Sequence, residues 1–290
     1  MFGLLRERIT RLARGHRDGA AAELADYSRS IDEYNAAQSN REMLDAIRGY
    51  NHSIVDALHG IRSLAGLRLL DVGASPHGYA LERALAHGAK EYVGVGLDIS
   101  ESFELRTPSG CGRLGYMNAE ALSFKDEEFD AIVSMSTFEH IGDLVSCLSE
   151  FHRVLKPGGG ALISFEPIWT CSYGHHLHHL GEASRLVPDW AHLLWERDEM
   201  AAHLDRCWPA DAPWSASEAC AWIYDGDGLN RKGIRETKAI LEASPLRIEW
   251  ISPMVDSPRD PRQLAAAAAR TGLAEEELMT KGLSVYLTRH

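Results

Sequence analysis

The segment Leu67-Arg-Leu-Leu-Asp-Val-Gly-Ala-Ser-Pro-His-Gly78 joins a short apolar run to a turn with glycine at both ends. The apolar run is typical of a buried strand, and such a turn lets the backbone approach a ligand before a helix begins. A helix is expected over residues 79–87, and a second buried strand in Tyr92-Val-Gly-Val-Gly-Leu-Asp98. Strand, turn, helix and strand form one βαβ unit, which predicts a parallel sheet.

The same alternation continues along the chain. Further strands are expected at residues 130–134, 161–165, 246–251 and 283–288, with a helix at residues 144–155. These elements predict an α/β fold with a Rossmann-like, doubly wound sheet that is mostly parallel and has an antiparallel last strand. An N-terminal helical arm and an inserted cap are expected beside this sheet.

Four regions differ in composition and pattern. Residues 1–65 are expected to form the helical arm or lid, and residues 66–165 the cofactor-binding core. Residues 166–245 interrupt the strand pattern and hold six of the seven tryptophans, so an inserted substrate cap is expected there. Residues 246–290 would supply the C-terminal strands that complete the core sheet.

The composition is that of a soluble globular protein, with 45% hydrophobic residues, 25% charged residues and a net charge of −12. No apolar run approaches the ~20 residues that cross a bilayer, so no membrane association is expected. The negative charge disfavours a nucleic-acid partner, because it repels phosphate backbones. Five cysteines without a CxxC pair favour a reducing, cytoplasmic compartment.

Two nucleotide-type cofactors compete for the turn that ends at Gly78. Asp98 ends the second strand, where a carboxylate can accept hydrogen bonds from both ribose hydroxyls of an adenosine. A dinucleotide needs backbone N–H groups for its pyrophosphate, but Ser75 and Pro76 crowd this turn and remove a donor. S-adenosylmethionine has no phosphate, so the turn favours it over NAD.

Five segments in order make the sequence similar to the class I S-adenosylmethionine-dependent methyltransferases of the small-molecule type. These segments are Leu70 to Gly78, Val93 to Asp98, Asn118 to Phe124, Phe129 to Ile141 and Phe151 to Gly160. The resemblance covers about residues 65–165 and recurs in the last two strands. It implies S-adenosyl-L-methionine as the cofactor and a transferase that acts in biosynthesis.

The resemblance also implies which residues hold the cofactor. Asp71, Gly73 and Ser75 would border its methionine moiety, although the family prefers glycines around Ser75. Asp98 would hold the ribose, with Ile99 beside it.

The remaining cofactor contacts are expected from later loops and from the arm. Asn118 stands where the family usually has an aspartate beside the adenine, and its amide oxygen can still accept a hydrogen bond. Ser136 would lie near the cofactor sulfur. The other expected contacts are Ala119, Glu120, and Tyr27 and Tyr34 of the lid.

The acceptor is expected at the carboxyl ends of the strands, where open α/β sheets bind ligands. Glu139 and His140 lie in one such loop, and residues 166–179 lie in the next. A histidine can take the proton of a hydroxyl or amine at neutral pH. His175 and His176 are therefore the leading candidates for the catalytic base, followed by His140 as the third.

The same loops offer contacts to the acceptor, of which Glu139, Trp169, Tyr173 and His179 are the expected ones. His175 and His179 would share one helix face at a spacing that can bind zinc, but no HExxH pattern is present, so no metal is expected. The histidines equally suit packing or surface positions. The tryptophans of the cap suit a ring-containing acceptor, or a core of the cap itself.

We therefore expect a methyltransferase that uses S-adenosylmethionine for O-, N- or C-methylation of a small-molecule acceptor, such as a secondary metabolite with a ring system. An O-methyltransferase for a sugar or polysaccharide precursor fits the histidines and the aromatic cap nearly as well. A non-catalytic protein that binds the cofactor is a third hypothesis, because the turn at residues 75–77 departs from the family pattern. The arm or the cap could also form a homodimer interface.

Overall fold

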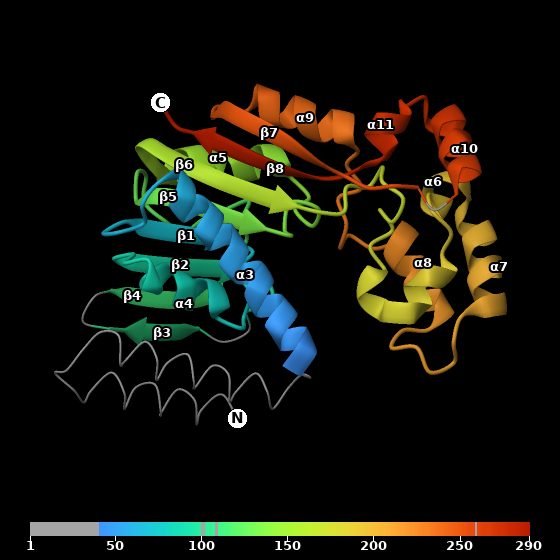
Figure 1. Cartoon of the computed structure of the whole chain (residues 1–290), viewed down its shortest axis with the longest axis horizontal. Coiled ribbons are helices and arrows are strands. Elements are labelled where there is room, and N and C mark those ends of the chain that lie inside the picture. The colour runs from blue at the N-terminus through green and yellow to red at the C-terminus, as the bar shows by residue number, and fades with distance from the viewer. Residues whose placement is uncertain (1–40, 100–101, 108–109, 259) are drawn as a thin grey trace.

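The computed structural model describes residues 41–99, 102–107, 110–258 and 260–290. A central mixed sheet is flanked by helices on both faces, and a helical cap stands beside it (Figure 1). The strands are β1 (Arg68–Val72), β2 (Glu91–Gly96), β3 (Phe103–Arg106), β4 (Cys111–Tyr116), β5 (Phe129–Met135), β6 (Leu155–Phe165), β7 (Arg247–Val255) and β8 (Thr280–Thr288). The helices of the core are α3 (Arg41–Ile61), α4 (Tyr79–Ala86), α5 (Leu144–Val154) and α9 (Ile234–Ala243).

The strand order is β3-β4-β2-β1-β5-β6-β8-β7. The five central strands β4, β2, β1, β5 and β6 pair in parallel, whereas β8 pairs antiparallel with both β6 and β7. The predicted fold class is confirmed, including the antiparallel last strand. The sequence interpretation missed two strands, β4 and β3, and β3 adds a third antiparallel pair at the opposite edge.

Alternate residues of each strand face opposite layers of helices. Leu69 of β1 belongs to the cluster that packs against α3 and α4. Leu70, the next residue, belongs to the cluster that packs against α5 and α9. Because both faces are covered, the central strands are almost continuously apolar, as the sequence predicts.

The cap has a hydrophobic core of its own, built from η1 (His178–Leu186), α7 (Arg197–Cys207) and α8 (Ala216–Tyr224). The short helix α6 (Ala191–Leu194) contributes Ala191 to this core and also packs with α10 (Pro261–Thr271) and α11 (Glu275–Leu278), which join β7 to β8. The C-terminal region thus contributes helices beside the cap as well as two strands. In the described part of the chain, every helix is too short or too polar to cross a bilayer.

The N-terminal arm is described only from α3 onward, so Tyr27 and Tyr34 lie outside the described residues. Asp56 of α3 accepts hydrogen bonds from Arg83 at 2.6 and 2.9 Å, and lies 2.6 Å from the Nε2 of His87. These contacts fix α3 to α4, so that α3 crosses the sheet and ends beside β5 and β6 (Figure 1).

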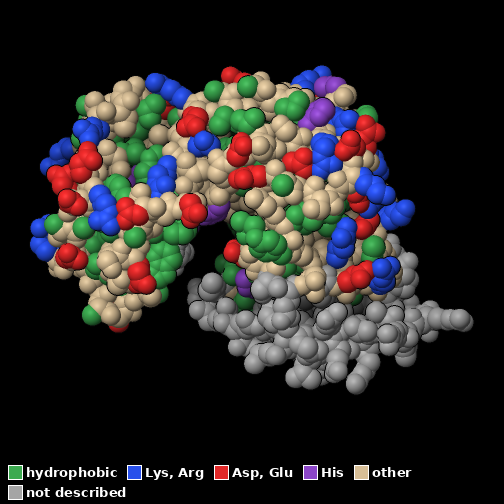
Figure 2. Space-filling model, turned by 180° about the vertical axis from the view of Figure 1, so that it is seen from behind, with side chains coloured by type: hydrophobic (Ala, Val, Ile, Leu, Met, Phe, Trp, Pro, Cys, Tyr) green, Lys and Arg blue, Asp and Glu red, His purple; other side chains and the backbone are tan. Residues whose placement is uncertain are grey.

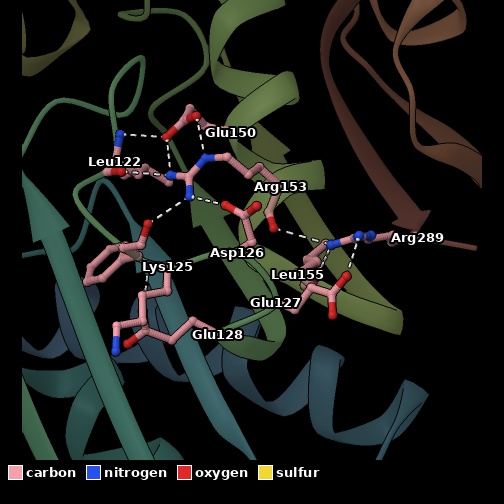
Figure 3. Close-up of polar contacts among 10 residues, drawn as sticks. Leu122, Lys125, Asp126, Glu127, Glu128, Glu150, Arg153, Leu155 and Arg289 are labelled. Atoms are coloured by element: carbon pink, nitrogen blue, oxygen red, sulfur yellow. Dashed lines mark hydrogen bonds and ion pairs between the residues drawn. The ribbon is translucent and has the colours of Figure 1, made fainter.

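An arginine network fixes the loop between β4 and β5 to α5 (Figure 3). The guanidinium of Arg153 donates to Glu150 at 2.7 and 2.9 Å and to Asp126 at 2.9 Å. It also donates to the backbone carbonyls of Leu122 and Phe124, both at 2.7 Å. Arg153 thereby provides hydrogen-bond donors for backbone carbonyls of a loop that has no regular secondary structure. That loop begins at the carboxyl end of β4.

Candidate functional site

The carboxyl ends of the five parallel strands meet along one line, which we call the carboxyl end of the sheet. The arrows of β5 and β6 point toward the cap in Figure 1, so this line faces the cap. The loops that follow these strands hold almost all of the predicted cofactor and acceptor residues. In open α/β sheets this is the position of the ligand crevice.

The turn after β1 is shaped by close contact with the loop after β5. Gly73 has a φ of +83°, and a Cβ placed there would lie 1.8 Å from Oγ1 of Thr137. Ser75 Oγ lies 2.8 Å from Nδ1 of His77, so the unusual residues of this turn bind each other. A turn this close to its neighbour accepts only glycine at position 73.

Asp71 lies beneath this turn, not on its surface. It is buried and accepts a hydrogen bond from the hydroxyl of Tyr92. Burial raises its pKa to about 7, and the Tyr92 hydrogen bond opposes the rise. Asp71 therefore supports the turn from inside the sheet, and any contact with a cofactor remains a prediction.

The loops after β2 and β4 place an acid and an amide at the same end of the sheet. Asp98 is exposed two residues beyond β2, while Ile99 is buried. Asn118 is exposed two residues beyond β4, and its Oδ1 accepts the backbone N–H of Glu120 at 2.9 Å. Their contacts with the ribose and adenine of a cofactor remain a prediction.

The two neighbours of Asn118 have structural contacts. Ala119 is buried in the core beneath the loop. Glu120 accepts the backbone N–H of Asp143 at 2.9 Å, next to the start of α5. These contacts explain how the loop is held, and they leave cofactor binding by Ala119 and Glu120 as a prediction.

Ser136 begins the loop after β5 with a φ of +48°, and its Oγ lies 3.1 Å from the hydroxyl of Tyr50. Tyr50 belongs to α3 and is 44% exposed, and burial of its remainder raises the pKa of its hydroxyl. The sequence interpretation missed Tyr50, although it did expect tyrosines of the arm to cover the cofactor. The contact brings α3 to the carboxyl end of the sheet.

Glu139, His140 and His176 come together although two different loops supply them. One possible ligand atom from each of the three residues lies within 4.8 Å of the others. The ring centroids of His140 and His176 are 4.6 Å apart. His140 is exposed, whereas Glu139 and His176 are buried. Of the three predicted bases, the structure therefore unites His140 and His176.

The structure places His175 apart from this cluster. Its side chain is 1% exposed, its Nδ1 accepts the backbone N–H of Leu177 at 3.1 Å, and its ring centroid lies 5.7 Å from that of His192. His175 thus packs inside the cap. Its role as a base remains a prediction that this burial disfavours.

Of the other expected acceptor residues, Trp169 lines one cavity together with Glu139 and His176. Trp169 packs against His192 with 4.7 Å between ring centroids, and Tyr173 packs near His178 with 6.2 Å. Burial raises the pKa of Tyr173, so its hydroxyl stays protonated at neutral pH. The side chain of His179 lies outside the described part of the structure.

An aromatic groove of about 490 Å³ lies on the cap and is lined by Trp214, Glu218, Ala221, Trp222, Asp225 and Gly226. The ring centroids of Trp214 and Trp222 are 5.4 Å apart. Trp222 also lies 6.5 Å from the ring centroid of His140, so the groove adjoins the histidine cluster. Figure 2 shows a cleft between the sheet domain and the cap, with hydrophobic side chains on its walls and histidine at its closed end.

The residues that form the sheet and its loops are similar to known methyltransferases. The family model described as a methyltransferase domain matches residues 70–163. An uncharacterised methyltransferase of Mycobacterium avium (strain 104) is 30% identical over 181 residues, which are 59% of this chain and 70% of that protein. Another, from Mycobacterium sp. (strain JLS), is 34% identical over 122 residues, which are 41% of this chain and 47% of that protein. The match thus spans about half the length of this second relative.

An S-adenosylmethionine dependent methyltransferase from Mesorhizobium loti aligns with a TM-score of 0.49 and 20% sequence identity. The alignment covers 81% of this chain and 96% of that chain.

Proposed function

Because this chain belongs to the class I S-adenosylmethionine-dependent methyltransferase family, we propose that it transfers a methyl group from S-adenosylmethionine to a small-molecule acceptor. The observation that carries the proposal is the arrangement at the carboxyl end of the sheet. There the Gly73 turn, the exposed Asp98 and the exposed Asn118 follow three neighbouring strands. The loop after β5 touches the Gly73 turn through Thr137 and carries Glu139 and His140 of the histidine cluster, which the aromatic groove adjoins.

The residues present fit the cofactor of the family. Because Gly73 has no Cβ, the turn can lie tightly against Thr137. Asp98 offers a carboxylate for the ribose hydroxyls, and Asn118 offers an amide for the adenine. S-adenosylmethionine, when bound, supplies an electrophilic methyl group on a positively charged sulfur. The chain itself has to hold the donor in line with the acceptor and to exclude water from both.

We place the acceptor between the aromatic groove and the histidine cluster. The rings of Trp214 and Trp222 provide a flat apolar wall, which suits a ring-containing molecule. His140 provides an exposed imidazole 6.5 Å from the Trp222 ring centroid. S-adenosylmethionine, held by Asp98 and Asn118, would supply the methyl group, and in the absence of a bound ion the histidine cluster would take the acceptor proton.

A panel of acceptors tests this proposal. Phenols and other ring hydroxyl compounds would be incubated with S-adenosylmethionine and the full chain, beside sugar nucleotides, and formation of S-adenosylhomocysteine would be measured. We expect turnover with a ring compound. Trp222→Ala should raise the KM for that acceptor, while Trp250→Ala, which removes a 39% exposed tryptophan of β7, should not.

The same panel decides between the remaining hypotheses. Turnover with sugar nucleotides alone would reject the ring-containing acceptor and favour a sugar O-methyltransferase. Binding of S-adenosylhomocysteine without turnover on any acceptor would favour the non-catalytic hypothesis. With an active acceptor in hand, His140→Asn should lower kcat by about 100-fold or more if the cluster accepts the proton.

A further inference from the structure

Glu139 is the most unusual ionisable side chain at the carboxyl end of the sheet. It is 5% exposed, and in the described part of the protein neither of its carboxylate oxygens has a hydrogen-bond partner. Burial raises its pKa well above the ordinary value; the N–H of its own backbone opposes the rise, and the nearby Glu166 adds to it. A buried carboxylate without a donor is costly unless a proton or a cation neutralises it.

The surroundings of Glu139 offer both the ligands and the space for a cation. His140 and His176 each direct a possible ligand atom to within 4.8 Å of its carboxylate. A cavity of about 10 Å³ is lined by Glu139 and His176 but not by His140, and it has the size that one water molecule or ion requires. Arg231 and Lys232 also line it, but the guanidinium of Arg231 donates to backbone carbonyls and the ammonium of Lys232 pairs with Glu236.

His140 is held in the orientation of a metal ligand. Its Nδ1 lies 2.6 Å from the carbonyl oxygen of Gly228. A carbonyl only accepts, so Nδ1 carries the proton and Nε2 keeps the lone pair. A metal-ligating histidine usually donates its other ring N–H to a carbonyl or carboxylate in this way.

The backbone on both sides of the cluster is constrained. Asn230 donates from Nδ2 to the carbonyls of Phe138 at 2.6 Å and Ile141 at 2.9 Å, which fixes the turn that carries Glu139 and His140. His176 has a φ of +62°, a left-handed conformation that is uncommon outside glycine. Such strained positions concentrate at functional sites, where the surrounding structure holds them.

We propose that Glu139, His140 and His176 bind one divalent transition-metal ion, for which Zn²⁺ is the best-suited occupant. Two imidazoles and a carboxylate form a ligand set that zinc binds in catalytic sites, and three protein ligands leave one coordination position open. The proposal replaces the expectation of a metal-free chain. That expectation considered His175 and His179, a different pair.

An open position beside the aromatic groove gives the ion a chemical role. It would polarise an acceptor oxygen and lower the pKa of its proton, which would then leave to solvent water. With the ion bound, the two imidazoles would serve as ligands, so solvent water would replace the cluster as the acceptor of the proton in the proposed methyl transfer. This role rests on the proposed methyl transfer, but binding of the ion does not.

The test is calorimetric titration of the full chain with ZnCl₂ after treatment with a chelator. We expect one Zn²⁺ per chain at micromolar or lower concentration. Glu139→Gln and His176→Asn should each weaken binding by about tenfold or more, because loss of a ligand costs at least as much as loss of its supporting hydrogen bond. Asparagine is chosen at position 176 because it tolerates a left-handed backbone.

His178→Asn is the matched control. His178 is exposed, and its ring centroid is 5.0 Å from that of His176, but it is not a member of the cluster. We expect this variant to bind Zn²⁺ as wild type does. Weaker binding in His178→Asn with unchanged binding in Glu139→Gln would overturn the proposal, as would failure of wild type to bind Zn²⁺ at micromolar concentration.

Thermal unfolding supplies a second readout that does not depend on His176→Asn being folded. Metal-free Glu139→Gln should have a Tm at least as high as that of metal-free wild type, because a buried amide is neutral without having to take up a proton. It should also lose the rise in Tm that Zn²⁺ gives wild type.

Titration of the same samples with S-adenosylhomocysteine separates the two proposals. Retained cofactor binding without zinc binding rejects the metal site alone, and loss of both in wild type rejects the proposed function as well.

Discussion

Gly73 and Thr137 touch across the carboxyl end of the sheet so closely that a Cβ at position 73 would lie 1.8 Å from Thr137 Oγ1. Gly73 follows β1 and Thr137 follows β5, two neighbouring parallel strands. The contact therefore couples the turn proposed for the methionine moiety to the loop that carries Ser136 and Glu139.

Gly73→Ala should abolish detectable binding of S-adenosylhomocysteine by calorimetry, because the turn has to move away from Thr137. Gly66→Ala is its control: Gly66 also has a positive φ, +76°, but a Cβ there would meet nothing within 4 Å. The control should lose about 1–2 kcal/mol of stability and keep its affinity. Thr137→Gly added to Gly73→Ala should restore part of the binding. No recovery would contradict the steric account.

Tyr50→Phe should weaken S-adenosylhomocysteine binding by about 2- to 10-fold, the effect of one neutral hydrogen bond. The variant removes only the hydroxyl that lies 3.1 Å from Ser136 Oγ. Tyr116→Phe, at a 68% exposed tyrosine, should bind as wild type does. Equal affinities in all three proteins would show that the Tyr50–Ser136 contact does not position the cofactor site.

The outline of the fold was predictable because the central strands are buried on both faces and so form apolar runs. The missed strand β4 has glycine at positions 112 and 115, and its partner β3 carries Glu104 and Arg106, which are exposed. Neither strand has an apolar run, because both lie at or next to the edge of the sheet. β4 pairs with β2 and β3 pairs with β4, and local sequence reveals neither contact.

The site was less predictable than the fold. His175 and His176 are adjacent in the sequence, yet the first packs inside the cap and the second meets His140. The left-handed conformation of His176 turns the chain between them, and composition gives no sign of it. Tyr50 was missed for a different reason: only the crossing of α3 over the sheet brings it to Ser136.

Arg153→Lys should lower the free energy of unfolding by about 2 kcal/mol or more, measured by urea denaturation. Lysine cannot replace the bonds of the guanidinium to Glu150, Asp126 and two backbone carbonyls at once (Figure 3). Arg185→Lys, at an exposed pair with Glu182, should change stability by less than about 1 kcal/mol. Similar losses in both variants would refute the role of the network.

Mild acid should destabilise the cap through His192. Burial lowers the pKa of His192 to about 4, although its hydrogen bond to the carbonyl of Trp169 opposes the shift. Between pH 6.5 and 4 the unfolded chain binds a proton that the folded chain does not, so stability falls as the pH is lowered through this range. From pH 6.5 to 5 this group accounts for about 2 kcal/mol.

His192→Gln isolates this contribution. Glutamine can still donate to the Trp169 carbonyl but does not titrate, so the variant should lose less stability than wild type between pH 6.5 and 5. Urea denaturation at both pH values measures the difference. An identical loss in the two proteins would show that His192 is not the group responsible.

The most direct test of the central claim is calorimetric titration with S-adenosylhomocysteine, beside NAD and ATP, on wild type, Asp98→Asn and Asp211→Asn. Asp211 is an exposed acid of the cap and serves as the control. We predict micromolar binding of S-adenosylhomocysteine alone, weakened by about 1–3 kcal/mol in Asp98→Asn and unchanged in Asp211→Asn. Failure of wild type to bind S-adenosylhomocysteine, or a preference for NAD, would contradict the assignment of the Gly73 turn and Asp98 as the methyl-donor site.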